Sequence, residues 1–136
     1  MKIFICASKH FYHKIPPIKE ELEKQGHQIT LPNSFEDAMQ EEEIKKQGEK
    51  KHKEFKQKMY KEQEKKVKEN DALLILNYKK GEQENYIGGS VLLEMYEAWK
   101  TGKKIFLMNP VPINMLKDEI EGLNPIILNG DLLKIT

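Results

Sequence analysis

The amino-acid sequence predicts an α/β fold, doubly wound around a mostly parallel sheet of four to five strands. Short, continuously apolar runs recur along the chain, and segments with helical character separate them. Continuous apolar strands alternating with helices are typical of a parallel sheet that is covered on both faces. The length of 136 residues fits one domain, residues 1–136. The expected architecture is therefore flavodoxin-like or Rossmann-like, with right-handed crossovers.

Each expected element follows from a local pattern. The apolar runs predict strands at residues 2–7, 28–31, 72–77 and 104–108, and a fifth strand or an edge at 125–128. Helices are expected at 16–25, which Gly26 closes, at 90–100, and around 115–121, which Gly122 ends. Ligands of such sheets bind at the carboxyl ends of the strands, near the point where the strand order reverses. This rule selects the loops at 8–13, 77–90 and 109–112, and the first two are neighbours if the first strand lies beside the third.

The charge of the chain is concentrated in one segment. Charged residues make up 33% of the sequence, yet 23 basic and 22 acidic residues leave a net charge of +1, which argues against a polybasic nucleic-acid module. Residues 41–69 contain eleven Lys and eight Glu, with several Glu four residues before a Lys. We expect a long charged helical arm at about residues 36–69, between the second and third strands. Its apolar residues are sparse, and the stripe expected to touch the body consists of Phe55, Met59 and Val67 together with the polar Gln63. The rest of the arm is either solvated or packed on a partner subunit.

Several classes of protein are excluded by composition. The single cysteine, Cys6, allows no intramolecular disulfide and no multi-cysteine zinc site. We expect Cys6 to be a small core residue. His10 and His13 have no evident third ligand, so we expect no metal and no other cofactor. No apolar run is long enough to span a membrane, and the apolar start is too short for a secretory signal, so the expected location is cytoplasmic. Tyr96 and Trp99 are interpreted as core or interface residues rather than base-stacking groups.

The segment 85–94 contains the main candidate site residues. Gly88, Gly89 and Ser90 precede or begin a helix, and exposed N–H groups there form an anion site, although the same residues also suit an ordinary turn and N-cap. Glu94 shares a helix face with Ser90 and has apolar neighbours, so it is either a buried nucleophile or stabiliser of positive charge, or a surface Glu. Further cleft residues are expected directly after three of the strands: Ser8, Asn77 and Asn109.

These features resemble the nucleoside 2-deoxyribosyltransferase family over about residues 1–110. The resemblance rests on the opening strand, the run Asn70-Asp71-Ala72-Leu73-Leu74-Ile75-Leu76, the Gly-containing loop, the helix with Glu94, and the run from Ala98 to Leu107. It implies that Glu94 attacks the anomeric carbon of a nucleoside, displaces the base and forms a covalent glycosyl-enzyme, which water or a second base resolves. Related nucleotide hydrolases bind a 5′-phosphate through equivalent loops, which implies this role for Gly88, Gly89, Ser90 and Ser8.

The chain departs from the family pattern at three positions. Gln63 and Gly88 stand where the family has acids, and Tyr96 stands where it has a small residue. Without these acids, protonation of the base and positioning of the sugar are weakened. The preferred function is still that of a nucleoside or nucleotide N-glycosidic hydrolase or 2-deoxyribosyltransferase-like enzyme.

Two other functions stay open, namely a non-catalytic nucleotide sensor of the same fold and an interaction module that oligomerises through the charged helix. The expected partners are a small-molecule nucleoside or nucleotide and further copies of the chain, as a dimer. No membrane and no nucleic-acid polymer is expected as a partner.

Overall fold

The computed structural model describes residues 1–136 and contains one parallel sheet with the strand order β2-β1-β3-β4-β5. Its strands are β1 (Lys2–Cys6), β2 (Gln28–Thr30), β3 (Ala72–Ile75), β4 (Lys104–Leu107) and β5 (Ile126–Ile127). The predicted fold class is confirmed, and the fifth apolar run does form a strand. β1 pairs with both β2 and β3, so the segments that follow β1 and β3 are neighbours.

The strands end earlier than their apolar runs. Leu76 was expected inside the third strand, but β3 ends at Ile75. The backbone nevertheless continues the pairing on one side, because the Leu76 N–H donates to the Cys6 carbonyl at 3.0 Å. The Met108 N–H likewise donates to the Ile75 carbonyl at 3.0 Å. Buried residues therefore continue past the ends of β3 and β4, so the length of an apolar run indicates burial rather than the length of the strand.

Helices separate the strands along the chain. They are the 3-10 helix η1 (Lys9–Lys14), then α1 (Ile15–Lys24), α2 (Gln40–Lys45), α3 (Glu49–Glu69), α4 (Gly89–Lys100), α5 (Lys117–Gly122) and the 3-10 helix η2 (Leu132–Lys134). The loop expected after the first strand is instead η1, which runs directly into α1. The Ser8 hydroxyl caps it by accepting from the His10 N–H at 3.5 Å.

The two faces of the sheet carry separate apolar layers, because successive side chains of a strand point to opposite faces. Ile3 and Ile5 pack with Leu22 of α1 on one face. Phe4 and Cys6 point to the other face, where the residues that cover them come from three helices: Val67 of α3, Val91, Met95 and Ala98 of α4, and Ile120 of α5. Helices thus cover both faces of the sheet, as in a doubly wound fold.

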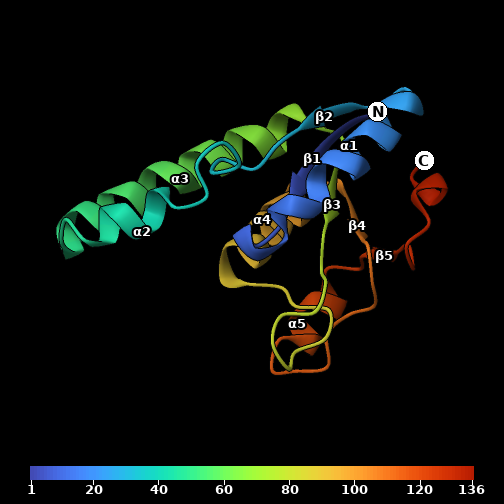
Figure 1. The fold of residues 1–136 in the computed structure, drawn as a ribbon. Helices are drawn as coiled ribbons and strands as arrows, with labels where there is room; N and C mark the ends of the chain where they lie inside the picture. The colour runs from blue at the N-terminus through green and yellow to red at the C-terminus, as the bar shows by residue number, and fades with distance from the viewer.

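The charged segment forms two helices rather than one. In Figure 1, α2 and the first part of α3 lie side by side and extend away from the sheet. The chain reverses between them at Gly48, whose φ of 112° lies in the region that favours glycine. Phe55 and Val67 of α3 are buried, and Val67 packs in the apolar layer that contains Phe4. No helix in the molecule has the combination of length and apolar character that a bilayer crossing needs.

Candidate functional site

A pocket of about 460 Å³ lies at the carboxyl ends of β1 and β3. The strand order reverses here, because the chain pairs β2 on one side of β1 and β3 on the other. Its walls come from η1, the segment 32–38, α2, α3, and the loop that leads into α4. This position agrees with the general rule for ligand sites of doubly wound sheets. A volume of this size falls within the range of about 300–1,000 Å³ that small-molecule sites occupy.

Most of the candidate residues line this one pocket. The structure brings together Ser8, Gly88, Gly89, Ser90 and Glu94. These residues come from two segments about 80 positions apart in the sequence, and the pairing of β1 with β3 unites them. Asn77 and Asn109 do not line the pocket.

The start of α4 presents backbone to the pocket. Gly88 is the N-cap residue, with φ −85° and ψ 174°, and no side chain caps the helix. Ser90 therefore lies inside the first turn rather than at the cap, and its hydroxyl oxygen accepts from Lys56 Nζ at 3.3 Å. A Cβ at Gly88 would lie 3.2 Å from the Tyr86 hydroxyl, whereas a Cβ at Gly89 would meet nothing. A side chain at position 88 would therefore need a small shift of the Tyr86 ring.

Glu94 is a buried carboxyl group on the wall of the pocket, with only 7% of the residue exposed. Burial raises its pKa from the ordinary 4.5 to about 8. The positive charge of Lys66, a hydrogen bond with the Cys6 thiol and the charge of Lys56 each oppose this rise in pKa. Burial thus favours the protonated form of Glu94 at neutral pH, and nearby cations limit the rise in its pKa.

Lys66 is the cation with the largest effect on Glu94. Its Nζ donates to the Leu31 carbonyl at 2.8 Å, which fixes the half-buried ammonium beneath the segment that follows β2. Burial lowers the pKa of Lys66 below its ordinary value, and the charges of Glu62 and Glu94 offset only part of this fall. Burial together with Glu94 raises the pKa of the Cys6 thiol well above its ordinary range. Cys6 is therefore a neutral core residue, as expected, and no thiolate competes with Glu94.

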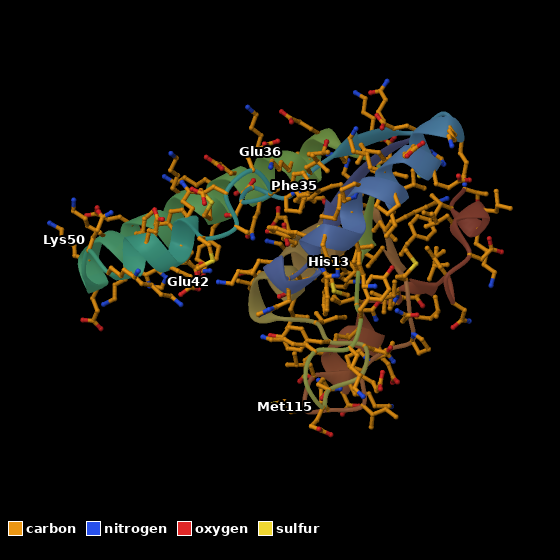
Figure 2. The ribbon with its side chains drawn as sticks, viewed as in Figure 1. His13, Phe35, Glu36, Glu42, Lys50 and Met115 are labelled. Carbon is orange, nitrogen blue, oxygen red and sulfur yellow. The ribbon has the colours of Figure 1, made fainter.

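Ion pairs hold α2 beside the pocket. Glu41 accepts from Lys56 at 3.1 Å, and its other oxygen lies 3.7 Å from His52 Nε2. Glu42 pairs with Lys9 of η1, and Figure 2 labels Glu42 on α2. Burial by itself would raise the pKa of Glu41, but the hydrogen bond from Lys56 and the charge of Lys56 outweigh it, so the pKa is lowered from its ordinary value. Sequence reasoning missed Glu41, Glu42 and Lys56 as pocket residues, because it treated their segment as an arm. The only hint was the apolar stripe that binds α3 to the body.

Two further polar side chains complete the wall. Burial raises the pKa of Tyr12 to about 12, and the charge of Glu94 adds to this rise, so its hydroxyl stays protonated. Asn33 donates through Nδ2 to the Met59 carbonyl at 3.4 Å, while its buried Oδ1 has no hydrogen-bond partner. A buried acceptor without a partner is costly. A donor group on a bound ligand would satisfy it.

Asn77 and Asn109 bind each other instead of facing the pocket. Asn77 Nδ2 donates to the carbonyls of Asn109 and Pro110 at 2.9 and 3.0 Å. In return the Asn109 backbone N–H donates to Asn77 Oδ1 at 2.9 Å, and Asn109 Nδ2 donates to the Asn77 carbonyl at 3.0 Å. These bonds join the segments that follow β3 and β4.

The fold and the site define a doubly wound α/β protein with a pocket at its switch point and a buried carboxyl group in the pocket wall. The chain matches no protein-family model, and it has no significant match among curated proteins. No group of three or more His, Cys, Asp or Glu side chains is placed to hold a metal ion. The chemistry of the site therefore has to be argued from its own residues.

Proposed function

We propose that the protein is a nucleoside or nucleotide N-glycosidic hydrolase or 2-deoxyribosyltransferase-like enzyme in which Glu94 is the nucleophile. The observation that carries this proposal is the buried Glu94 carboxyl in the same pocket as the backbone of Gly88 and Gly89. A carboxylate that meets an oxocarbenium-like carbon is the working group of retaining glycoside hydrolysis. The proposal includes a cytoplasmic location, where Cys6 stays a free thiol.

Three positions from separate segments support the resemblance to the nucleoside 2-deoxyribosyltransferase family, because they lie in one pocket. The resemblance assigns site roles to positions 63, 88 and 94, which lie on α3, in the loop before α4 and on α4. Gln63, Gly88 and Glu94 all line the pocket at the switch point. Separate segments that the resemblance places in one site therefore do meet in one cavity, although two of the three acids are absent.

The chemistry has two steps. A Glu94 oxygen forms a bond to the anomeric carbon while the bond from that carbon to the base nitrogen breaks, and the base leaves with the electron pair. Water or a second base then attacks the same carbon and releases Glu94 as a carboxylate, and the proton that the attacking molecule loses balances the proton that the departed base gains. Glu94 must be ionised to begin the first step, and the charges of Lys66 and Lys56 favour that form.

The test is release of free base from a panel of 2′-deoxynucleosides and their 5′-monophosphates, measured by chromatography. Glu94→Gln keeps the shape of the side chain and is expected to abolish release. Glu97→Gln is the matched control, because Glu97 lies on the same helix and pairs with Lys100 at 3.1 Å outside the pocket. Intact-mass measurement of the wild type should also detect a glycosyl adduct that Glu94→Gln lacks. Equal release by wild type and Glu94→Gln would refute the assignment.

A non-catalytic nucleotide-binding function is the second candidate, and Gln63 is the residue that favours it. An amide at this position lines the pocket where the family has an acid, so it can hydrogen-bond a base without donating a proton to it in a reaction. This candidate predicts thermal stabilisation without turnover. A ligand at 100 times its dissociation constant stabilises the folded state by about 2.7 kcal/mol. Stabilisation by a nucleotide, with no base released from any substrate, would favour binding over catalysis.

A further inference from the structure

One lysine of the pocket has no acidic partner. Four lysines line the pocket, and three of them lie within 4.0 Å of the carboxylates of α2, namely Lys9, Lys45 and Lys56. The fourth is Lys80, on the loop between β3 and α4, and it takes part in no ion pair. The positive charge of Lys80 is therefore available to a ligand.

The loop holds Lys80 in a defined position. The loop leaves the end of β3 and returns to the start of α4 (Figure 1). Lys80 and Gln83 exchange two backbone hydrogen bonds, each 3.0 Å long, and the Tyr86 N–H donates to the Tyr78 carbonyl at 2.8 Å. The Nζ of the half-buried Lys80 lies 4.5 Å from the centroid of the Tyr86 ring. This cation–π contact orients the ammonium group without neutralising its charge, so less conformational entropy is lost when an anion binds.

Tyr86 also connects Lys80 to the start of α4. Its hydroxyl lies 3.5 Å from the Lys80 Nζ, and a Cβ at Gly88 would lie 3.2 Å from the same hydroxyl. The free ammonium group is thus close to the glycine at which α4 begins. Lys56 contacts the same turn through Ser90 at 3.3 Å, but Glu41 already pairs with Lys56.

Further basic groups lie at this rim of the pocket. Burial lowers the pKa of His10, and the charges of Lys80 and Lys9 lower it further, because both ammonium groups are close to the imidazole. His10 and Lys9 follow β1, whereas Lys80 follows β3, and the pairing of these two strands brings the groups together. The rim therefore gathers cations from two separate segments.

The pocket as a whole has more positive than negative charge. Its four lysines face the carboxylates of Glu41 and Glu42, and with Glu94 neutral two positive charges are left over. The N–H groups at the start of α4 add a partial positive charge. A phosphate monoester carries about −1.5 to −2 at pH 7. Two lysine charges together with the helix terminus suit an anion with more charge than one phosphate monoester.

We propose that Lys80 binds a second phosphate group, so that the preferred ligands of the pocket are nucleoside 5′-diphosphates. The inference rests on the proposed function, in which a nucleotide occupies the pocket with its 5′-phosphate at Gly88, Gly89 and Ser90. The two phosphates of a diphosphate share one bridging oxygen, so the second phosphate must lie directly beside the first. Lys80 is the unpaired cation beside that position, and a lysine binds phosphate as a point charge.

Calorimetric titration with matched pairs of 2′-deoxynucleoside 5′-monophosphates and 5′-diphosphates tests the proposal. The protein is Glu94→Gln, in which the proposed reaction cannot consume the ligand, and EDTA removes the Mg²⁺ that would mask the diphosphate. A hydrogen bond to a charged group corresponds to roughly tenfold in affinity, so the diphosphate should bind about tenfold more tightly than the monophosphate. Equal affinity for the two would overturn the proposal.

Two substitutions added to Glu94→Gln assign the preference to Lys80. Lys80→Met should bring the affinity for the diphosphate close to that for the monophosphate, and Lys80→Arg, which keeps the charge, should retain the preference. Lys79→Met is the matched control, because Lys79 is exposed, pairs with Glu84 at 3.4 Å and does not line the pocket. It should behave like the parent protein. An unchanged preference in Lys80→Met, or an equal loss of affinity for both nucleotides, would overturn the role of Lys80.

Inorganic pyrophosphate tests whether the nucleoside part of the ligand matters. It should bind more weakly than the nucleoside diphosphates, and equal affinity would overturn a nucleotide as the occupant. The outcome is separate from the test of the proposed reaction. Base release from monophosphates without any preference for diphosphates would overturn this inference and leave the proposed enzyme intact. A preference that depends on Lys80, without base release, would support the inference and count against the enzyme.

Discussion

The Nζ of Lys56 lies 3.3 Å from the Oγ of Ser90, which ties the charged helix α3 to the first turn of α4. The same Nζ lies 3.1 Å from Glu41 Oε1, so one lysine links α2, α3 and α4. α2 buries no side chain, and its ion pairs therefore contribute much of what holds it beside the pocket. The charged segment of the sequence is part of the site wall as well as an extension of the fold.

Lys56→Met should loosen α2. The variant removes the partner of Glu41, and ion pairs of this exposure stabilise by about 0–1 kcal/mol, so we expect up to about fivefold faster amide exchange in residues 40–45. Hydrogen exchange followed by mass spectrometry measures this change, and added salt should reduce the difference between variant and wild type. Lys58→Met is the control, because Lys58 is exposed on the same helix. Identical exchange in all three proteins would contradict a role of Lys56 in holding α2.

Asn77→Ala should destabilise the fold without acting directly on the pocket. Asn77 is fully buried, and the substitution leaves the Asn109 N–H and two carbonyls without their partner. Each buried polar group that loses its partner costs about 1–3 kcal/mol, so with three such groups we expect a loss of at least about 3 kcal/mol in the free energy of unfolding. Urea denaturation measures the loss. Unchanged stability combined with lost ligand binding would instead support the substrate-binding role expected from the sequence.

The sequence predicted the features that local burial determines. The four apolar runs up to residue 108 identified the strands, and the glycines at 88 and 89 identified the start of α4 to within one residue. Local pattern carries no information on the Lys9–Glu42 pair, which joins residues 33 positions apart. It also cannot distinguish an asparagine that faces a ligand from one that bonds to backbone, because the side-chain amide suits both. Only the three-dimensional structure therefore shows where α2 lies and that Asn77 hydrogen-bonds to the backbone after β4.

Glu94 should make stability depend on pH. Its pKa is about 8 in the folded state and about 4.5 when exposed, so the folded state holds a proton that the unfolded state has lost between these values. The stabilisation from Glu94 is fully present below pH 4.5 and is lost as the pH rises through 8. The free energy of unfolding of the wild type should fall relative to Glu94→Gln by the order of 1 kcal/mol per pH unit in this window.

Chemical denaturation of both proteins at pH 5, 6.5 and 8 measures this difference. Glu97→Gln provides the comparison, because Glu97 pairs with Lys100 at the surface of the same helix. Its stability should run parallel to that of the wild type over the same range. Parallel curves for the wild type and Glu94→Gln would show that Glu94 ionises near its ordinary pKa.

Lys66→Met should move the activity profile to higher pH. The charge of Lys66 lowers the pKa of Glu94, so its removal leaves burial less opposed and raises that pKa further above 8. A nucleophilic Glu94 must be ionised, and kcat/KM for base release should therefore rise with pH, with its midpoint higher in the variant than in the wild type. Lys65→Met should leave the midpoint unchanged, because Lys65 is exposed and pairs with Glu69. If Glu94 instead acts as a general acid, the rate of the wild type should fall as the pH rises through 8.

The identity of the leaving base should control the rate more strongly than in an enzyme with a full set of acids. Gln63 and Gly88 line the pocket and carry no carboxyl group, so neither can protonate the departing base. A nucleoside whose base leaves as a neutral molecule without protonation, such as 7-methyl-2′-deoxyguanosine, should therefore react faster than 2′-deoxyguanosine. Gln63→Glu should narrow this gap by accelerating the unmethylated substrate, since it places a carboxyl group beside the base. Chromatographic rates for the two nucleosides with both proteins measure the effect, and equal rates in the wild type would show that another group supplies the proton.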